Sequence, residues 1–138
     1  MAKQPTHKYR ASVMLKDLGW EVDDVERILR NGRMTRRFDL FGFADLLCVQ
    51  GDATLAVQVC SIRPSGSDLQ THQAKMLAEP RLARCLEAGW LVELWGVRNV
   101  PKKNGEAVTI RSFELSDDGQ TVLVFEGSEV LVPLERSV

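Results

Sequence analysis

The pattern of apolar and polar positions changes from helical to strand-like spacing early in the chain. Apolar residues at helical spacing over about 8–18 predict a first helix, and Gly19 is well placed to end it. The acidic segment over about 20–25 is interpreted as a short strand. The basic run that follows, over 30–37, is predicted to be a turn.

Two strongly apolar strands are expected next, over about 38–49 and 53–62, and both are apolar on their two faces. Such strands are typical of a sheet that is covered by helices on each side. The elements expected after them are helices over about 67–78 and 80–89, and strands over about 90–97, 107–115, 120–126 and 129–134. The order predicts an α/β protein with a C-terminal β-meander.

Composition places the chain among ordinary globular proteins and excludes several classes. Its 138 residues, 44% of them apolar and 27% charged, indicate one domain. No run reaches the roughly 18 apolar residues of a membrane span, so no membrane association is expected. The three cysteines lie in apolar sequence and have no zinc-site spacing, which favours reduced core residues in a cytoplasmic protein. A net charge of −1 argues against a broad basic surface that binds nucleic acid non-specifically, but it is compatible with a local basic patch.

The central hairpin carries two isolated polar residues. Gly51-Asp52 fits a type II′ turn, and this turn sets a register in which Asp45 lies opposite Gln58. Directly opposed side chains share a face, with Cβ atoms roughly 4.5–5.5 Å apart. We therefore expect the carboxylate and the amide to touch.

Two interpretations of this contact stay open. A buried Asp–Gln hydrogen bond satisfies both groups and needs no further role. A buried carboxylate is nevertheless costly without a charged partner or a metal, and a neutral amide compensates an anion poorly. Oxygen ligands on adjacent strands are the kind that Mg²⁺ or Mn²⁺ accepts, so Asp45 and Gln58 are candidate metal ligands.

The segments "RRFDLFGFADLLCV" and "TLAVQVCS", with "HQAKMLAEPRLARCLEAGWLVELWGV" after them, resemble the PD-(D/E)XK, or restriction-endonuclease-like, nuclease superfamily. The likeness is greatest to small Holliday-resolvase-like nucleases of phages, and it covers about residues 10–115. It implies an αβββαβ core with a mixed central sheet flanked by helices. The single domain 1–138 would then consist of a core over about 8–97 and a β-strand extension over about 105–135.

The resemblance also implies roles for particular residues. Asp45 matches the metal-binding aspartate, Gln58 matches a second acidic ligand, and Cys60 stands where the family has a lysine. Because a thiol does not replace an ammonium group, Lys75 on the next helix is the candidate for the catalytic lysine. An ordinary solvated lysine is the alternative at that position.

Other charged residues near this motif are weaker candidates. Six residues of straight strand would separate Asp39 from Asp45 by roughly 20 Å, so Asp39 is expected to face solvent unless a bulge near Gly42 shortens the path. His72 lies three residues before Lys75 on the same helical face, as an accessory residue or a surface histidine. One of four acidic residues could supply a third carboxylate, although their density suggests a solvated face: Glu21, Asp23, Asp24 and Glu26.

The basic run before the metal-site strand is the candidate DNA-binding element. Arg33, Arg36 and Arg37 could neutralise backbone phosphates, although a charge run is often only a solvated surface.

The leading hypothesis is a Mg²⁺- or Mn²⁺-dependent DNA endonuclease. Selectivity for branched DNA and assembly as a homodimer are both compatible with this hypothesis. The resemblance implies cytoplasmic action, with a phage-encoded protein in a bacterial host as one option. The second hypothesis is a nuclease-fold module without catalysis that binds DNA or a protein. A third is an inhibitor or assembly protein that recruits a partner through its C-terminal strand edges.

Overall fold

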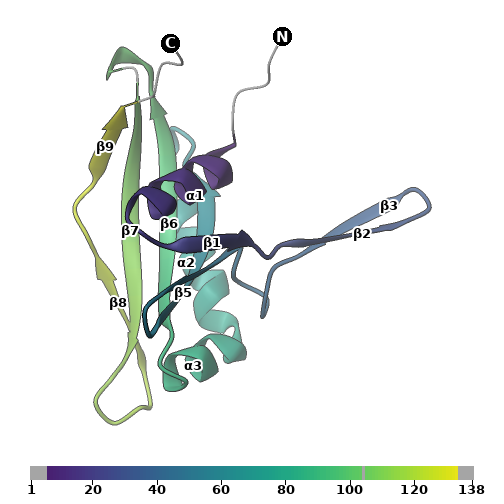
Figure 1. The fold of residues 1–138 in the computed structure, drawn as a ribbon, viewed down its shortest axis with the longest axis vertical. Helices are drawn as coiled ribbons and strands as arrows, with labels where there is room; N and C mark the ends of the chain where they lie inside the picture. The colour runs from purple at the N-terminus through teal and green to yellow at the C-terminus, as the bar shows by residue number, and fades with distance from the viewer. Residues whose placement is uncertain (1–5, 104, 134–138) are drawn as a thin grey trace.

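The computed structural model describes residues 6–103 and 105–133. Figure 1 shows its elements. In chain order they are α1 (His7–Asp17), β1 (Glu21–Asp24), β2 (Arg27–Asn31), β3 (Met34–Phe38), β4 (Leu46–Gln50), β5 (Ala53–Ser61), α2 (Asp68–Ala78), α3 (Pro80–Glu87), β6 (Leu91–Val100), a 3₁₀ turn (Pro101–Lys103), β7 (Gly105–Leu115), β8 (Val122–Glu126) and β9 (Val130–Pro133). None of the described helices has the length and apolarity that crossing a membrane requires.

The main sheet has seven strands in the order β1-β4-β5-β6-β7-β8, and β9 also pairs with β7. The β5–β6 pair is parallel and the other described pairs of this sheet are antiparallel. The parallel pair is connected through α2 and α3, as a crossover connection requires. The predicted α/β class with a mixed sheet is therefore confirmed.

Helices cover both faces of this sheet, as the two-sided apolarity of the central strands predicts (Figure 1). On one face, Ala11 and Leu15 of α1 pack with Val57 and Trp95 in one buried cluster. On the other face, α2 and α3 contribute Leu69, Met76, Leu82 and Cys85 to a second buried cluster. Residues that alternate along β5, such as Val57 and Ala56, belong to opposite clusters, as the period of a strand requires.

The β4–β5 hairpin has the predicted register. Gln50 pairs with Ala53 and Leu47 with Ala56. Gly51 has φ 58°, while no other residue of the turn has positive φ, as a type II′ turn requires. The regular ladder ends at Leu46, so Asp45 lies immediately beyond the strand, at the edge of the hydrogen-bonded region.

The prediction of a turn over 30–37 is wrong. These residues belong to a second, two-stranded sheet, in which β2 and β3 form a hairpin that turns at Gly32, with φ 62°. Every residue of both strands is exposed, and the hairpin projects away from the body of the protein (Figure 1). We call residues 27–38 the ribbon. Because both faces of the ribbon are exposed, its strands do not alternate between apolar and polar residues. The sequence alone therefore does not distinguish the ribbon from a loop.

The prediction of one strand over 38–49 is also wrong. The chain leaves β3 at Phe38 and makes a tight turn in which Leu40 and Ala44 form an isolated bridge. Phe41 has φ 53° and Gly42 has φ 78°, so two successive residues adopt left-handed conformations. This reversal, residues 39–45, is called the 39–45 loop below.

The C-terminal strands exist, but they do not form the predicted meander. β8 pairs with one end of β7, over Arg111–Leu115, and β9 pairs with the other end, over Gly105–Val108. The two strands therefore lie end to end along β7 and not side by side.

Candidate metal centre

Asp45 and Gln58 touch, as the hairpin register predicts. Gln58 Nε2 donates a hydrogen bond of 2.8 Å to Asp45 Oδ2, and the backbone N–H of Val59 donates a second bond of 3.0 Å to the same oxygen. The two side chains are buried, with exposed fractions of 5% and 8%. The amide supports the carboxylate as a donor here, and whether Gln58 also binds a metal stays a prediction.

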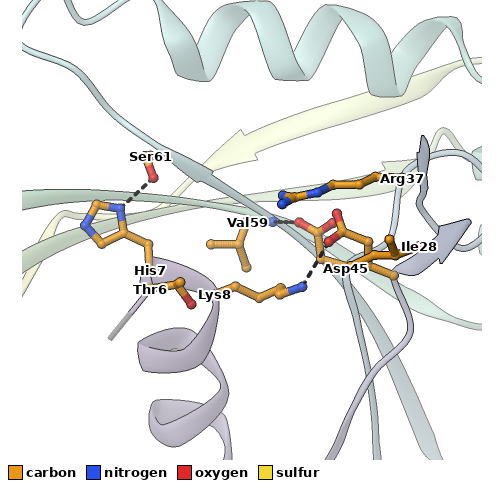
Figure 2. A pocket seen from close by; sticks show the side chains of 9 residues that line it. Thr6, His7, Lys8, Ile28, Arg37, Asp45, Val59 and Ser61 are labelled. Atoms are coloured by element: carbon orange, nitrogen blue, oxygen red, sulfur yellow. Dashed lines mark hydrogen bonds and ion pairs between the residues drawn. The ribbon is translucent and has the colours of Figure 1, made fainter. Parts of the chain in front are cut away.

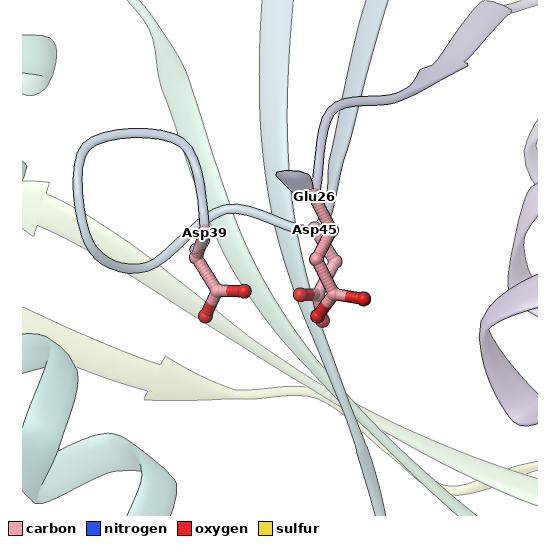
Figure 3. A group of neighbouring side chains, drawn as sticks. All are labelled: Glu26, Asp39 and Asp45. Atoms are coloured by element: carbon pink, nitrogen blue, oxygen red, sulfur yellow. The ribbon is translucent and has the colours of Figure 1, made fainter. Parts of the chain in front are cut away.

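Three carboxylates meet at this point. Oxygen atoms of Glu26, Asp39 and Asp45 all lie within 4.8 Å of one another (Figure 3). We call these residues the acidic triad. They come from three segments: the β1–β2 connection, the residue after β3, and the residue before β4. Side chains from separate segments converge here even though their mutual repulsion disfavours this arrangement.

The expectation that Asp39 lies far from Asp45 is wrong, and the 39–45 loop is the reason. Leu40 and Ala44 bridge each other across this loop, so the six-residue path folds back on itself. The sharp turn at Phe41 and Gly42 replaces the straight strand that the prediction assumed. Asp39 therefore lies beside Asp45 and is half-buried.

Glu26 is the acidic residue that sequence alone could not select from the four after α1. Its backbone N–H bonds to Asp24 Oδ1 at 3.1 Å, and the neighbouring Val25 N–H bonds to the Asp45 carbonyl at 2.9 Å. These bonds fix the β1–β2 connection against Asp45. Lys8 of α1 contacts Glu26 at 3.2 Å and Asp24 at 2.8 Å. It is a cation at this site that the sequence pattern did not indicate.

Burial and neighbouring charges make the triad difficult to ionise fully. Burial raises the pKa of Asp45 to about 8, and the adjacent Asp39 and Glu26 carboxylates act in the same direction, against the lowering effect of the Val59 N–H. Asp45 therefore retains its proton at neutral pH in the protein alone. A cation at the triad would favour the ionised form and displace that proton.

No protein-family model, curated protein or solved structure matches this chain. What the triad does must therefore follow from its own chemistry. Oxygen ligands at this density suit Mg²⁺ and Mn²⁺, which are hard cations.

The other predicted catalytic residues lie on the α2 side of the triad. Lys75 is exposed and lines the same cavity as Asp39, so α2 brings an ammonium group to the site. Burial, together with the charge of Lys75, lowers the pKa of His72 and keeps its ring neutral at pH 7. The structure thus groups Lys75, His72 and Asp39, while their catalytic roles stay predictions.

Cys60 is a core residue. Only 3% of it is exposed, within the cluster that α2 and α3 cover. Burial raises the pKa of its thiol to about 11, so it carries no charge at neutral pH. Cys48, Cys60 and Cys85 are all buried and unpaired with one another, as expected for reduced core cysteines.

The predicted DNA-binding arginines lie on the ribbon. Arg33 follows the turn glycine, and Arg36 and Arg37 are exposed on β3. Arg37 lines the cavities on both sides of the triad. Arg27 and Arg30 on β2 extend this basic set to five arginines, and the ribbon contains no acidic residue.

A second cavity, of about 370 Å³, opens on the α1 side of the triad, with Glu26, Asp45 and Lys8 in its wall (Figure 2). At its far end His7 Nδ1 lies 2.6 Å from Ser61 Oγ, and His7 Nε2 lies 3.2 Å from Glu106 Oε2. Glu106 is buried, and this oxygen has no other described hydrogen-bond partner. The site therefore favours a proton on Nε2, which leaves Nδ1 to accept from Ser61 when the ring is neutral.

Proposed function

We propose that this protein is a Mg²⁺- or Mn²⁺-dependent DNA endonuclease of the PD-(D/E)XK type. The observation that carries the proposal is the convergence of Glu26, Asp39 and Asp45 within 4.8 Å at the base of an arginine-rich ribbon. A cluster of carboxylates weakens the binding of nucleic acid nearby, and a bound cation would remove that repulsion. Carboxylates that could hold a metal ion, next to arginines that could hold a phosphate backbone, are suited to metal-assisted hydrolysis of a phosphodiester.

The metal ligands in this proposal are the three triad carboxylates, with Gln58 holding Asp45 in position through its hydrogen bond of 2.8 Å. A bound Mg²⁺ would polarise the scissile phosphate and lower the pKa of a coordinated water. The chain prepares this site by burying Asp45 and by directing two N–H donors at one of its oxygens.

The cations around the triad have separate tasks. Lys75 stabilises the negative charge that develops on the phosphate, from the α2 side. Arg36 and Arg37 hold the DNA backbone, and Arg33 extends this contact to the tip of the ribbon. Lys8 keeps Glu26 in place through its ion pair of 3.2 Å.

The topology supports the nuclease-like fold. Without the ribbon, the order is α1, then antiparallel β1, β4 and β5, then α2 and α3, then β6 parallel to β5. This agrees with the αβββαβ order that the resemblance implies, except that two helices, α2 and α3, stand where that order has one. Asp45 lies where the middle strand of the antiparallel trio begins, which corresponds to the metal-binding end of the motif.

The second candidate function is a nuclease-fold module that binds DNA without cutting it. Gln58 and Cys60 favour it, because both replace charged residues of the motif with neutral ones. Under this alternative, Lys8 is the permanent counterion of the acidic triad, and the ribbon alone accounts for DNA affinity.

Cleavage assays distinguish these candidates. Linear, nicked and branched DNA should be cut in Mg²⁺ or Mn²⁺ by the wild-type protein and by Asp52→Asn, a matched control in the exposed turn of the same hairpin. Asp45→Asn should lose at least about 100-fold in rate, because several kcal/mol of charge stabilisation depends on the metal. Equal rates for Asp45→Asn and Asp52→Asn would overturn the nuclease assignment.

A further inference from the structure

A cavity on one side of the triad has a volume of about 670 Å³. It lies on the side of Asp39 and Lys75, between the base of the ribbon, the 39–45 loop and α2. Its size falls within the roughly 300–1,000 Å³ of small-ligand sites. Because Asp39 belongs both to its wall and to the triad, a ligand here would adjoin the proposed metal site.

Two phenylalanine rings line this cavity and remain accessible. Phe38 is 42% exposed and Phe41 is 38% exposed. Phe41 packs at a tilt of 52° on Trp90, with ring centroids 5.8 Å apart, so its ring is supported from one side. Its φ of 53° is unusual for a bulky residue, and such strained backbone positions cluster at functional sites. An exposed, supported ring held by a strained backbone is suited to stacking on a ligand.

The same wall carries an excess of positive charge, because Asp39 is the one carboxylate among its described lining residues and four of them are cations. Arg27, Arg37 and Lys75 form no ion pair with any residue in 6–103 or 105–133. Arg81, the remaining cation of the wall, is paired with Glu79 at 2.8 Å. Free cations that converge on a hollow indicate an anionic ligand, and the two rings indicate a flat one.

We propose that this cavity binds one unpaired nucleotide of a DNA strand, with its base against Phe38 and Phe41 and its phosphates on Arg27 and Lys75. The choice of DNA as the ligand rests on the proposed function. A base that is held in a duplex stack does not reach such a hollow, whereas an unpaired base pays little or no unpairing cost to enter it. The site therefore selects DNA with an overhang, flap or branch over continuous duplex.

Binding measurements in EDTA test this selection without cleavage. Fluorescence anisotropy should show about tenfold tighter binding of a duplex with a three-nucleotide overhang than of the blunt duplex, which is the effect of one base–aromatic stack. Phe38→Ala and Phe41→Gly should abolish the preference. Glycine at position 41 removes the ring and tolerates the positive φ. Phe125→Ala is the control, because Phe125 is 52% exposed on β8, outside this cavity.

Lys75→Gln is a second variant on an exposed helical position, and it should weaken binding of both DNAs while leaving thermal unfolding unchanged. A wild-type protein that binds overhang and blunt DNA equally would overturn the proposal, as would a preference that survives in both phenylalanine variants. Because no metal is present, these results are independent of cleavage. Overhang preference without any metal-dependent cutting would retain the cavity assignment and reject the nuclease assignment.

Discussion

At the residue scale, Asp45 is the group on which the site depends. It is a carboxylic acid with an exposed fraction of 5%, held by an amide and a backbone N–H, and faced by two further carboxylates. None of these partners supplies a full positive charge to Asp45. In the absence of a cation, Asp45 therefore stays protonated in the folded protein. This protonation makes the free energy of unfolding depend on pH.

In EDTA, the free energy of unfolding should fall as the pH rises from about 4 to about 8. The unfolded aspartate has a pKa of about 3.9, whereas burial raises the pKa of folded Asp45 to about 8. Between these values the folded protein binds more protons than the unfolded chain, so stability decreases with pH. Asp45→Asn should remove this part of the dependence in urea titrations at several pH values. An unchanged slope in Asp45→Asn would contradict the assignment of the raised pKa to this residue.

Gln58→Glu should make the protein more dependent on metal. The substitution replaces the donor at 2.8 Å from Asp45 Oδ2 with a fourth carboxylate. We expect a lower melting temperature than wild type in EDTA at pH 8, because like charges then oppose each other in a buried site. Mg²⁺ should raise the melting temperature by more than it does in wild type. Gln50→Glu, at the exposed end of the same hairpin, removes only a long hydrogen bond of 3.4 Å from Gln50 Nε2 to the Leu18 carbonyl, so Mg²⁺ should raise its melting temperature no more than that of wild type.

At the scale of elements, the 39–45 loop assembles the site. Its reversal brings Asp39 back to Asp45, and Gly42 makes it possible with φ 78°. A Cβ at this position would also meet the side-chain ends of Glu79 and Arg81. The geometry of the loop, and with it the position of Asp39, therefore depends on a glycine.

Gly42→Ala should lower stability by about 1 kcal/mol, because a Cβ disfavours the left-handed conformation. It should also weaken Mn²⁺ binding, since the loop that carries Asp39 must shift. The matched control is Gly119→Ala, which has φ 72° and open space around its Cβ position in a distant turn. This control should lose similar stability and keep its metal affinity. Equal metal affinity in the two variants would show that the loop does not position the site.

The ribbon is the second functional element, and salt dependence measures its contacts. Replacing Arg30, Arg33 and Arg36 with glutamine should weaken DNA binding and reduce the slope of log K against log salt by roughly 2–3, since each phosphate contact contributes about 0.9. Thermal stability should stay close to wild type, because all three side chains are exposed. Arg84→Gln, an exposed arginine on α3, should leave the slope unchanged. A slope that does not change in the triple variant would place the DNA elsewhere.

At the scale of the whole molecule, the sequence predicts those features that depend on residues close together in the chain, such as strand faces, the hairpin register and helix ends. Both central strands have apolar residues on two faces, and the Gly51-Asp52 turn sets their register, so the contact between Asp45 and Gln58 is predictable. The breaks at Gly19 and Pro80 likewise separate elements that the structure contains. The sheet order, with a parallel β5–β6 pair between antiparallel ones, agrees with the predicted α/β class.

From the sequence, the acidic triad could be predicted only as one alternative among several, for a reason that is also physical. Asp39 reaches Asp45 only because Phe41 adopts a conformation that its own propensity disfavours. Glu26 is one of several carboxylates in a polar segment, and only tertiary hydrogen bonds select it. Every residue of the two ribbon strands is exposed in the described structure, so these strands leave no apolar pattern in the sequence.

Isothermal titration calorimetry with Mn²⁺ tests the central claim most directly, because it measures the ion that the triad is proposed to hold. We predict one binding site per chain in wild type and in Asp52→Asn, and none in Asp45→Asn. Binding at pH 7 should release a proton, visible as a heat that varies with buffer, because the pKa of Asp45 is raised to about 8. No binding by the wild-type protein, or the same binding by Asp45→Asn, would contradict the account.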